Sequence, residues 1–128
     1  MLLDEFDIQE FVFETLKPLD IPVFFTARKE SKLPLVVFNI TGETGYEYWD
    51  DEETTTKYRI SINIFSKGNY IKYKKQIKQL MKDAGFKRTD IPECQYQEDV
   101  EIFNQPMFFE YIKENYKSDK EILYKRKR

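Results

Sequence analysis

The clearest pattern in the chain is the alternation of apolar and polar residues between positions 57 and 66. Every second position carries a large apolar side chain: Tyr58, Ile60, Ile62 and Ile64. The intervening positions are polar: Lys57, Arg59, Ser61 and Asn63. A period of two residues is typical of a β-strand with one face in the core. We therefore expect the polar face to meet solvent or another subunit.

A second strand is predicted just before this one. Residues from Leu35 to Ile40 are apolar on both faces, as in the central strand of a sheet. Neighbouring strands joined by a loop usually pair antiparallel, so we expect these two strands to do so. The segment from Gly42 to Thr56 is then predicted to be a long acidic loop. Loops of this length inside a compact domain are usually functional or disordered.

Two helices are predicted where apolar residues recur at helical spacing, over residues 4–17 and 70–84. Asp4 is expected to cap the first helix, and Pro18 follows its end. Gly85 suits the left-handed position after the second helix. The polar positions of the second helix carry Lys72, Lys74, Lys75, Lys78 and Lys82. These lysines form either a solvated face or a nucleic-acid surface.

Shorter apolar runs predict strands over residues 23–26, 86–89, 93–98 and 102–113. The last of these is expected to be central, with Pro106 at an edge position or a bulge. Residues 1–114 are thus predicted to form one α+β domain. Its mostly antiparallel sheet of about four to five strands is flanked by two main helices.

Residues 115–128 are predicted to be a basic tail, either a short helix or disordered. The tail ends in Lys125, Arg126, Lys127 and Arg128. This charge run is either solvated or in contact with an acidic partner surface.

The composition is compatible with a folded domain, because 41% of the 128 residues are hydrophobic and 16% are aromatic. A net charge of -2 gives no overall steering toward nucleic acid or membrane. The first residues lack the basic and apolar regions of a signal peptide, and no apolar run is long enough to span a bilayer. We therefore expect a protein of the reducing cytoplasm with no membrane partner.

The residue types needed for common catalytic sites are scarce. The chain has no His and one Cys, which removes His-based catalysis and the usual zinc sites. The run from Asp50 to Glu53 could bind a divalent cation, but it lacks the spaced ligands of a calcium loop. Cys94 is expected to be a small, semi-buried residue rather than a nucleophile. We therefore predict no enzyme activity, no metal and no cofactor.

The acidic segment also carries three large aromatic residues, a type enriched at interfaces. The predicted interface residues are Tyr46, Tyr48, Trp49, Asp50, Asp51, Glu52 and Glu53, with Arg59 on the following strand. The alternative is that this segment folds back and packs on its own domain.

The order of these segments resembles a known family. Leu19-Asp-Ile-Pro-Val23 and Leu33-Pro-Leu-Val-Val-Phe38 precede the acidic segment, and Tyr58-Arg-Ile-Ser-Ile-Asn-Ile-Phe65 follows it. A Tyr-rich helix then ends in Met81-Lys-Asp-Ala-Gly-Phe86, and Phe108-Phe-Glu-Tyr111 closes the domain. The chain thus resembles the tail completion, or tail terminator, proteins of long-tailed phages and prophages of Gram-positive bacteria, which join tail to head. The resemblance covers roughly residues 5–113.

This resemblance implies a structural virion protein. Family members cap the tail tube as a homo-oligomeric ring, typically a hexamer, which ends tail polymerisation and forms the head-docking surface. The implied partners are other copies of the chain, the major tail tube protein and a head-completion or neck protein. DNA would pass through the lumen without specific binding. The implied location is the head-proximal end of the tail in the virion, after synthesis in the host cytoplasm. Two alternatives are another neck or head-completion component and a nucleic-acid-binding protein.

Overall fold

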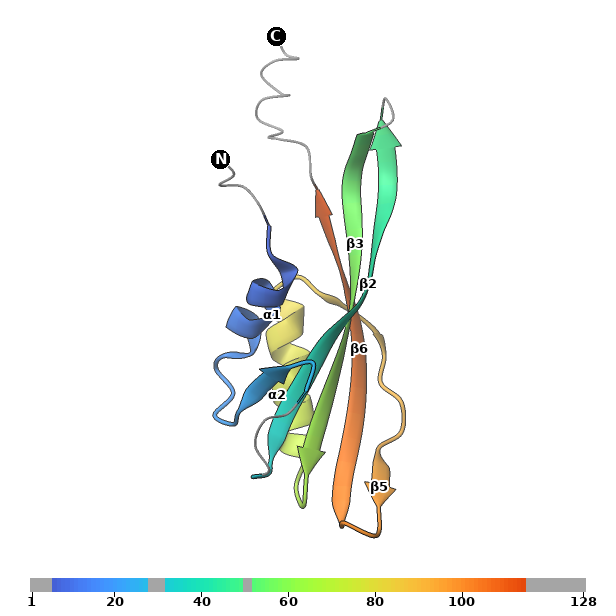
Figure 1. Ribbon diagram of the computed structural model, residues 1–128. Helices are drawn as coiled ribbons and strands as arrows, with labels where there is room; N and C mark the ends of the chain where they lie inside the picture. The colour runs from blue at the N-terminus through green and yellow to red at the C-terminus, as the bar shows by residue number, and fades with distance from the viewer. Residues whose placement is uncertain (1–5, 28–31, 50–51, 115–128) are drawn as a thin grey trace.

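The protein folds as one open, mixed β-sheet with two helices on one of its faces (Figure 1). The computed structural model describes residues 6–27, 32–49 and 52–114, with the backbone alone for 46–49 and 52–54. This α+β architecture confirms the predicted fold class. None of the helices in these ranges is both long and apolar enough to cross a bilayer.

The sheet has six strands, more than the predicted four to five. Strand β1 (Val23–Phe25) pairs parallel with β2 (Leu35–Trp49), and β2 pairs antiparallel with β3 (Glu52–Ser66). On its other side β3 pairs antiparallel with β6 (Ile102–Glu114). The far edge of β6 is shared by β4 (Lys87–Asp90) and β5 (Gln95–Gln97). Each of the six overlaps a segment predicted as a strand, including the three short strands at the edges.

The two helices begin and end close to the predicted positions, but the first is shorter. Helix α1 spans Ile8–Leu16 and is capped by Asp7, whose Oδ1 accepts a hydrogen bond from the Glu10 backbone N–H at 3.1 Å. The predicted start at residue 4 is therefore wrong, because residues 6 and 7 are not helical; Asp4 itself lies outside the described residues. Helix α2 spans Ile71–Asp83, and Gly85 follows it with φ 97°, as expected for the left-handed position.

The core lies between the helices and the face of the sheet that carries the alternating isoleucines. One row of core side chains crosses β2, β3 and β6. In this row Ile62 lies between Phe38 and Met107, and all three side chains are 0% exposed. The helices contribute Val12 and Leu16 from α1 and Ile77 and Met81 from α2. The alternation in β3 was thus a correct sign of a strand with one face in the core.

The predicted long loop from Gly42 to Thr56 is wrong, because most of this segment is strand. β2 continues to Trp49 and β3 begins at Glu52. The pairing has register shifts at Ile40/Gly42, Gly45/Glu47 and Glu47/Tyr48, where bulges interrupt the ladder. Aromatic and β-branched residues favour strands, and here they outweigh the carboxylates that indicated a loop.

The opposite face of the sheet is less exposed than its polar residues suggested. Ser61 is buried, in a row across the sheet with Asn39 and Phe108, whereas Arg59 is exposed. Pro106 lies on β6 between the segments that pair with β4 and with β5, so it occupies the local edge that was predicted.

The sheet extends beyond the helices at one end, as Figure 1 shows. We call this extension the arm; it comprises residues 42–49 of β2, 52–57 of β3 and 112–114 of β6. The rest of the described chain is called the body.

Candidate functional site

The outer edge of β2 is the most open part of the described sheet. β1 pairs with this edge only from Val36 to Phe38. From Asn39 to Trp49 no described strand pairs with it, although the inner edge follows β3 throughout. Unpaired strand edges are templates for another chain, and proteins usually protect them with Lys or Pro. The sequence from Asn39 to Trp49 contains neither residue, so the bulges and the charges of Glu43 and Glu47 are what opposes pairing at this edge.

The residues predicted as an interface are only partly placed by the structure. The backbone of Tyr46, Tyr48 and Trp49 belongs to β2, and that of Glu52 and Glu53 to β3. Trp49 pairs with Glu52, and Tyr48 with Glu53. The side chains of these five residues, together with Asp50 and Asp51, lie outside what the structure describes. So do Lys125, Arg126, Lys127 and Arg128.

Arg59 is the one predicted interface residue whose side chain is described. Its guanidinium crosses the hairpin and donates a hydrogen bond to Thr44 Oγ1 at 3.1 Å. Any Cβ at Gly42 would overlap this guanidinium, so glycine permits the close approach. Thr41 Oγ1 also donates to the Arg59 backbone carbonyl at 3.3 Å. Arg59 is thus ordered at the base of the arm on the face away from the helices.

An ion pair links the arm to the body on the same face. Lys57 Nζ lies 3.7 Å from Glu110 Oε1, and the two side chains are 27% and 15% exposed. Glu110 pairs with Arg59 across β3 and β6, so it lies near both cations. Partial burial makes this pair less screened than a surface pair.

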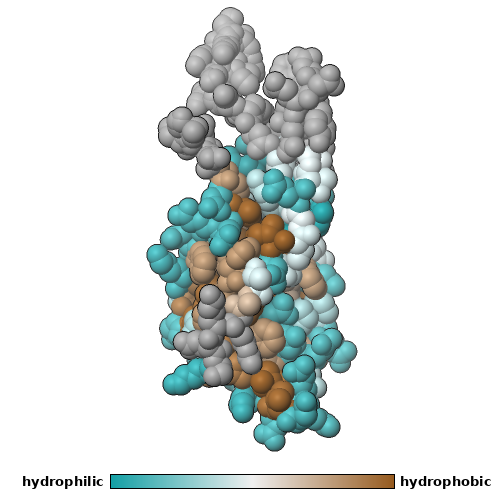
Figure 2. Space-filling view, in the orientation of Figure 1, coloured by the Kyte–Doolittle hydropathy of each residue, from teal (hydrophilic) through white to brown (hydrophobic). Residues whose placement is uncertain are grey.

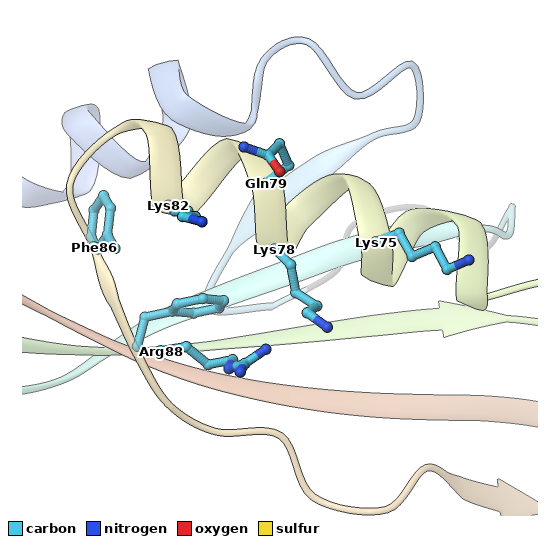
Figure 3. A pocket seen from close by; sticks show the side chains of 7 residues that line it. Lys75, Lys78, Gln79, Lys82, Phe86 and Arg88 are labelled. Carbon is cyan, nitrogen blue, oxygen red and sulfur yellow. The ribbon is translucent and has the colours of Figure 1, made fainter.

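A second surface, between α2 and β4, concentrates positive charge. A groove of about 520 Å³ is lined by Lys75, Lys78 and Lys82 from α2 and Arg88 from β4. Figure 3 shows Lys78 and Arg88 pointing into the same space between the helix and the sheet. No carboxylate lines the groove among the described residues, and none of them pairs with these four cations. We call this surface the basic groove.

The floor of the basic groove is apolar. It is formed by Phe86 and Phe109, which are 5% and 2% exposed. Lys75, Lys78 and Lys82 follow the i, i+3, i+7 spacing that places residues on one stripe of a helix. The sequence pattern indicates the lysines but does not connect Arg88 with them. Its approach depends on the pairing of β4 with β6, which no local pattern indicates.

A third surface lies on the other side of the helical layer, between α1 and β1. A groove of about 410 Å³ is lined by Glu10, Phe13 and Glu14 of α1 and by Leu19, Ile21 and Val23, with Lys17 at its rim. Phe13 is 37% exposed and packs edge-on against Phe38, with ring centroids 5.3 Å apart. Figure 2 shows apolar side chains gathered over the helical half of one face, bordered by hydrophilic ones.

The groups that could carry chemistry are few in the described ranges. Cys94 is half-buried, as predicted, and its thiol lies 3.7 Å from the Gln95 carbonyl. A hydrogen bond with Cys94, and then burial, raise the pKa of the Tyr70 phenol. No group of three or more His, Cys, Asp or Glu residues in residues 6–27, 32–49 and 52–114 could hold a metal ion.

No known protein family matches the chain, and no curated protein matches it. A proposal about function therefore depends on the residues and surfaces described above and on the resemblance seen in the sequence.

Proposed function

We propose that this protein is a tail terminator of a long-tailed phage or prophage. In this role it would assemble as a homo-oligomeric ring, with a hexamer as the expected form, at the head-proximal end of the tail tube. The ring would end tube polymerisation and provide the surface that docks a head-completion protein. No reaction and no cofactor are part of this role.

The observation that carries the proposal is the open edge of β2 on the arm. A strand edge without Lys or Pro, extending beyond the helices, can recruit a strand from a neighbouring subunit. The added main-chain hydrogen bonds would give affinity, and the aromatic residues of this segment would add contact area. The sequence resemblance to tail terminators points to the same use, because a ring needs a repeated contact between copies.

The mechanism would be geometric. One face of a closed ring matches the last ring of the tube, so it binds there. The other face offers no site for a further tube subunit, so polymerisation stops. DNA would pass through the lumen during ejection, and carboxylates facing the lumen would keep its phosphates from binding.

The test uses the purified protein alone and mixed with tail tube protein. Sedimentation and negative-stain microscopy should show rings, and tubes that are capped at one end and shorter than tubes grown alone. Replacing two exposed edge residues, Thr41→Lys with Glu43→Lys, should weaken ring formation and capping, because lysines on an edge strand oppose pairing. The control is Gln95→Lys with Gln97→Lys, two exposed positions on the edge strand β5.

The outcome against the proposal is a strict monomer that neither caps nor shortens tubes. Unchanged capping by the Thr41→Lys, Glu43→Lys variant would remove the β2 edge as the contact. In that case the oligomer would have to form through another surface.

A nucleic-acid-binding role is the second candidate, and the basic groove favours it. Contacts to phosphates would make binding to duplex DNA weaken steeply with salt. DNA retention at low salt, lost in a variant with the groove cations replaced, would support this role. The sequence pI near 5.3 opposes it, because most of the surface would repel a polyanion.

A further inference from the structure

The basic groove and the α1 side of the molecule carry opposite charge. Residues 71–88, which contain α2 and the first half of β4, include seven Lys or Arg and a single acid, Asp83. Residues 6–25, which contain α1 and β1, include Asp7, Glu10, Glu14 and Asp20 but one base, Lys17. A protein with a small net charge of -2 thus has one strongly basic side and one moderately acidic side, where Lys17 lies 3.5 Å from Glu14.

The two charged sides lie at opposite edges of the fold. The sheet order runs from β1 at one edge to β4 at the other. The groove beside α1 is lined by Val23 of β1, whereas the basic groove is lined by Arg88 of β4. One copy can therefore present its acidic side to the basic side of the next copy without using the same surface twice.

The acidic side also combines charge with exposed apolar area. Phe13, 37% exposed, lies between Glu10 and Glu14 on α1. On the basic side the rings of Phe86 and Phe109 are 5% and 2% exposed, so that surface offers mainly its cations. Interfaces typically pair an apolar centre with a polar rim, and complementary potentials fix the register of the partners.

We propose that the basic groove binds the acidic α1 surface (Asp7, Glu10, Phe13 and Glu14) of a second copy of this chain. The contact is head-to-tail, so repetition closes a ring if the rotation between copies allows it. This inference rests on the proposed ring-forming function and identifies one of its subunit contacts. It uses side chains of α1 rather than main-chain groups of the β2 edge, although Glu43 of that edge lies beside Asp7 and Glu10.

The burial of these rings disfavours single-stranded nucleic acid as the occupant. Proteins that bind single-stranded nucleic acid present exposed aromatic faces on which bases stack. The rings in the basic groove are buried, at 5% and 2% exposed, so they offer little surface for stacking. The acidic α1 surface of another copy supplies both the opposite charge and an exposed aromatic ring.

The test is a charge swap measured by sedimentation equilibrium. The groove variant carries Lys75→Glu, Lys78→Glu and Arg88→Glu; the α1 variant carries Glu10→Lys and Glu14→Lys. Each variant alone should self-associate on the order of tenfold more weakly than the wild type, because like charges then face each other. A mixture of the two should recover association, because every contact again joins opposite charges.

The matched control is Lys72→Glu, Lys74→Glu and Lys87→Glu, which makes the same change in net charge at positions that do not line the groove. This control should associate like the wild type at moderate salt. Circular dichroism and the urea midpoint of each variant establish that it is folded before its association is compared.

Several outcomes overturn the inference. One is a folded groove variant that associates like the wild type, and another is a mixture that does not recover association. A third is salt-dependent binding of duplex DNA that is lost in the groove variant while self-association is unchanged. If the groove variant still forms rings that cap tubes, the proposed contact is wrong but the proposed function stands.

If association follows the charge swap but no tube is capped, the tail role is wrong but the contact stands.

Discussion

The body and the arm are built from the same three strands but are stabilised differently. In the body, β2, β3 and β6 lie under two helices, and their buried side chains are mostly large and apolar. In the arm, the buried side chains that the structure describes are Thr55 and Thr56, which are 5% and 4% exposed. The body is thus held mainly by hydrophobic burial, whereas the arm depends more on the main-chain ladder.

This difference separates stability from assembly. Hydrophobic burial is the dominant favourable term in folding, so changes in the body should alter the free energy of unfolding. The exposed arm side chains that the structure describes, such as Glu43, Thr44 and Ile112, add little apolar burial, so changes at these positions should cost little folding free energy. Substitutions in the arm should therefore affect contacts with other chains more than stability.

The largest predicted effect is in the body. Phe38→Ala should lower the free energy of unfolding by about 3–5 kcal/mol, because it leaves a cavity beneath α1 where the ring packs against Phe13 and Phe25. Urea denaturation followed by circular dichroism measures the change. Ile112→Ala on the arm, at a side chain 42% exposed, is the comparison and should cost less than about 1 kcal/mol. Equal losses at the two positions would contradict the distinction between body and arm.

A smaller effect is expected where the arm joins the body. Phe11 lies among three rings, with centroid distances of 5.6 Å to Phe6, 5.3 Å to Phe86 and 5.0 Å to Tyr111. Phe11→Leu keeps an apolar side chain but removes these ring contacts, so we expect a loss of about 1–2 kcal/mol. The urea midpoint is the measurement. An unchanged midpoint would mean that the aromatic cluster does not stabilise the junction.

The ion pair on the face away from the helices should contribute still less. Glu110→Gln keeps the shape of the side chain but removes the attraction to Lys57, so a loss of at most about 1 kcal/mol is expected. The loss should shrink as salt is added, because salt screens partly exposed charges. Urea melts at two salt concentrations test this, and a loss that is independent of salt would point to packing rather than charge.

The smallest effect concerns alkaline pH. The raised pKa of Tyr70 means that the folded protein holds the phenol proton more tightly than the unfolded chain, whose phenol has a pKa near 10.0. The resulting stability is complete below that value and is lost as the pH rises through the higher, folded-state pKa. Tyr70→Phe should therefore show a shallower fall in stability above pH 10 than the wild type.

The matched control for this prediction is Tyr96→Phe. Tyr96 also packs on Phe103, with ring centroids 4.7 Å apart against 5.3 Å for Tyr70, and it is 49% exposed. Urea midpoints at pH 8 and at pH 10.5 should separate the two variants. Identical alkaline slopes in both variants would exclude Tyr70 as the source.

The core strands and both helices could be predicted from the sequence because each has a strong local period. The isoleucines of β3 alternate, and the buried residues of α2 recur at helical spacing, so burial follows the pattern. The strands of the arm could not be recognised in the same way. Glycines and carboxylates between Gly42 and Glu53 resemble a loop, and strand formation there depends on pairing with β3 and β6.

The candidate surfaces were predictable to a lesser degree. Five lysines on one helix are visible in the sequence, but the groove exists because β4 brings Arg88 beside them. Likewise, the sequence shows the aromatic and acidic residues of the segment from Gly42 to Thr56. It does not show that the outer edge of β2 is unpaired there, because that depends on where β1 lies in the sheet. Both features depend on contacts between distant parts of the chain, which local periods do not encode.

The end of β1 limits how a strand from another chain could slide along β2. β1 stops at Phe25, opposite Phe38, and Thr26 then turns the chain with φ 74°. An incoming strand would meet this turn and could not move further toward the helices. The body therefore blocks slippage of an added strand in this direction. Val36 and Phe38 already bond to the β1 segment, so the first outward-facing main-chain groups for a contact on the arm are those of Ile40.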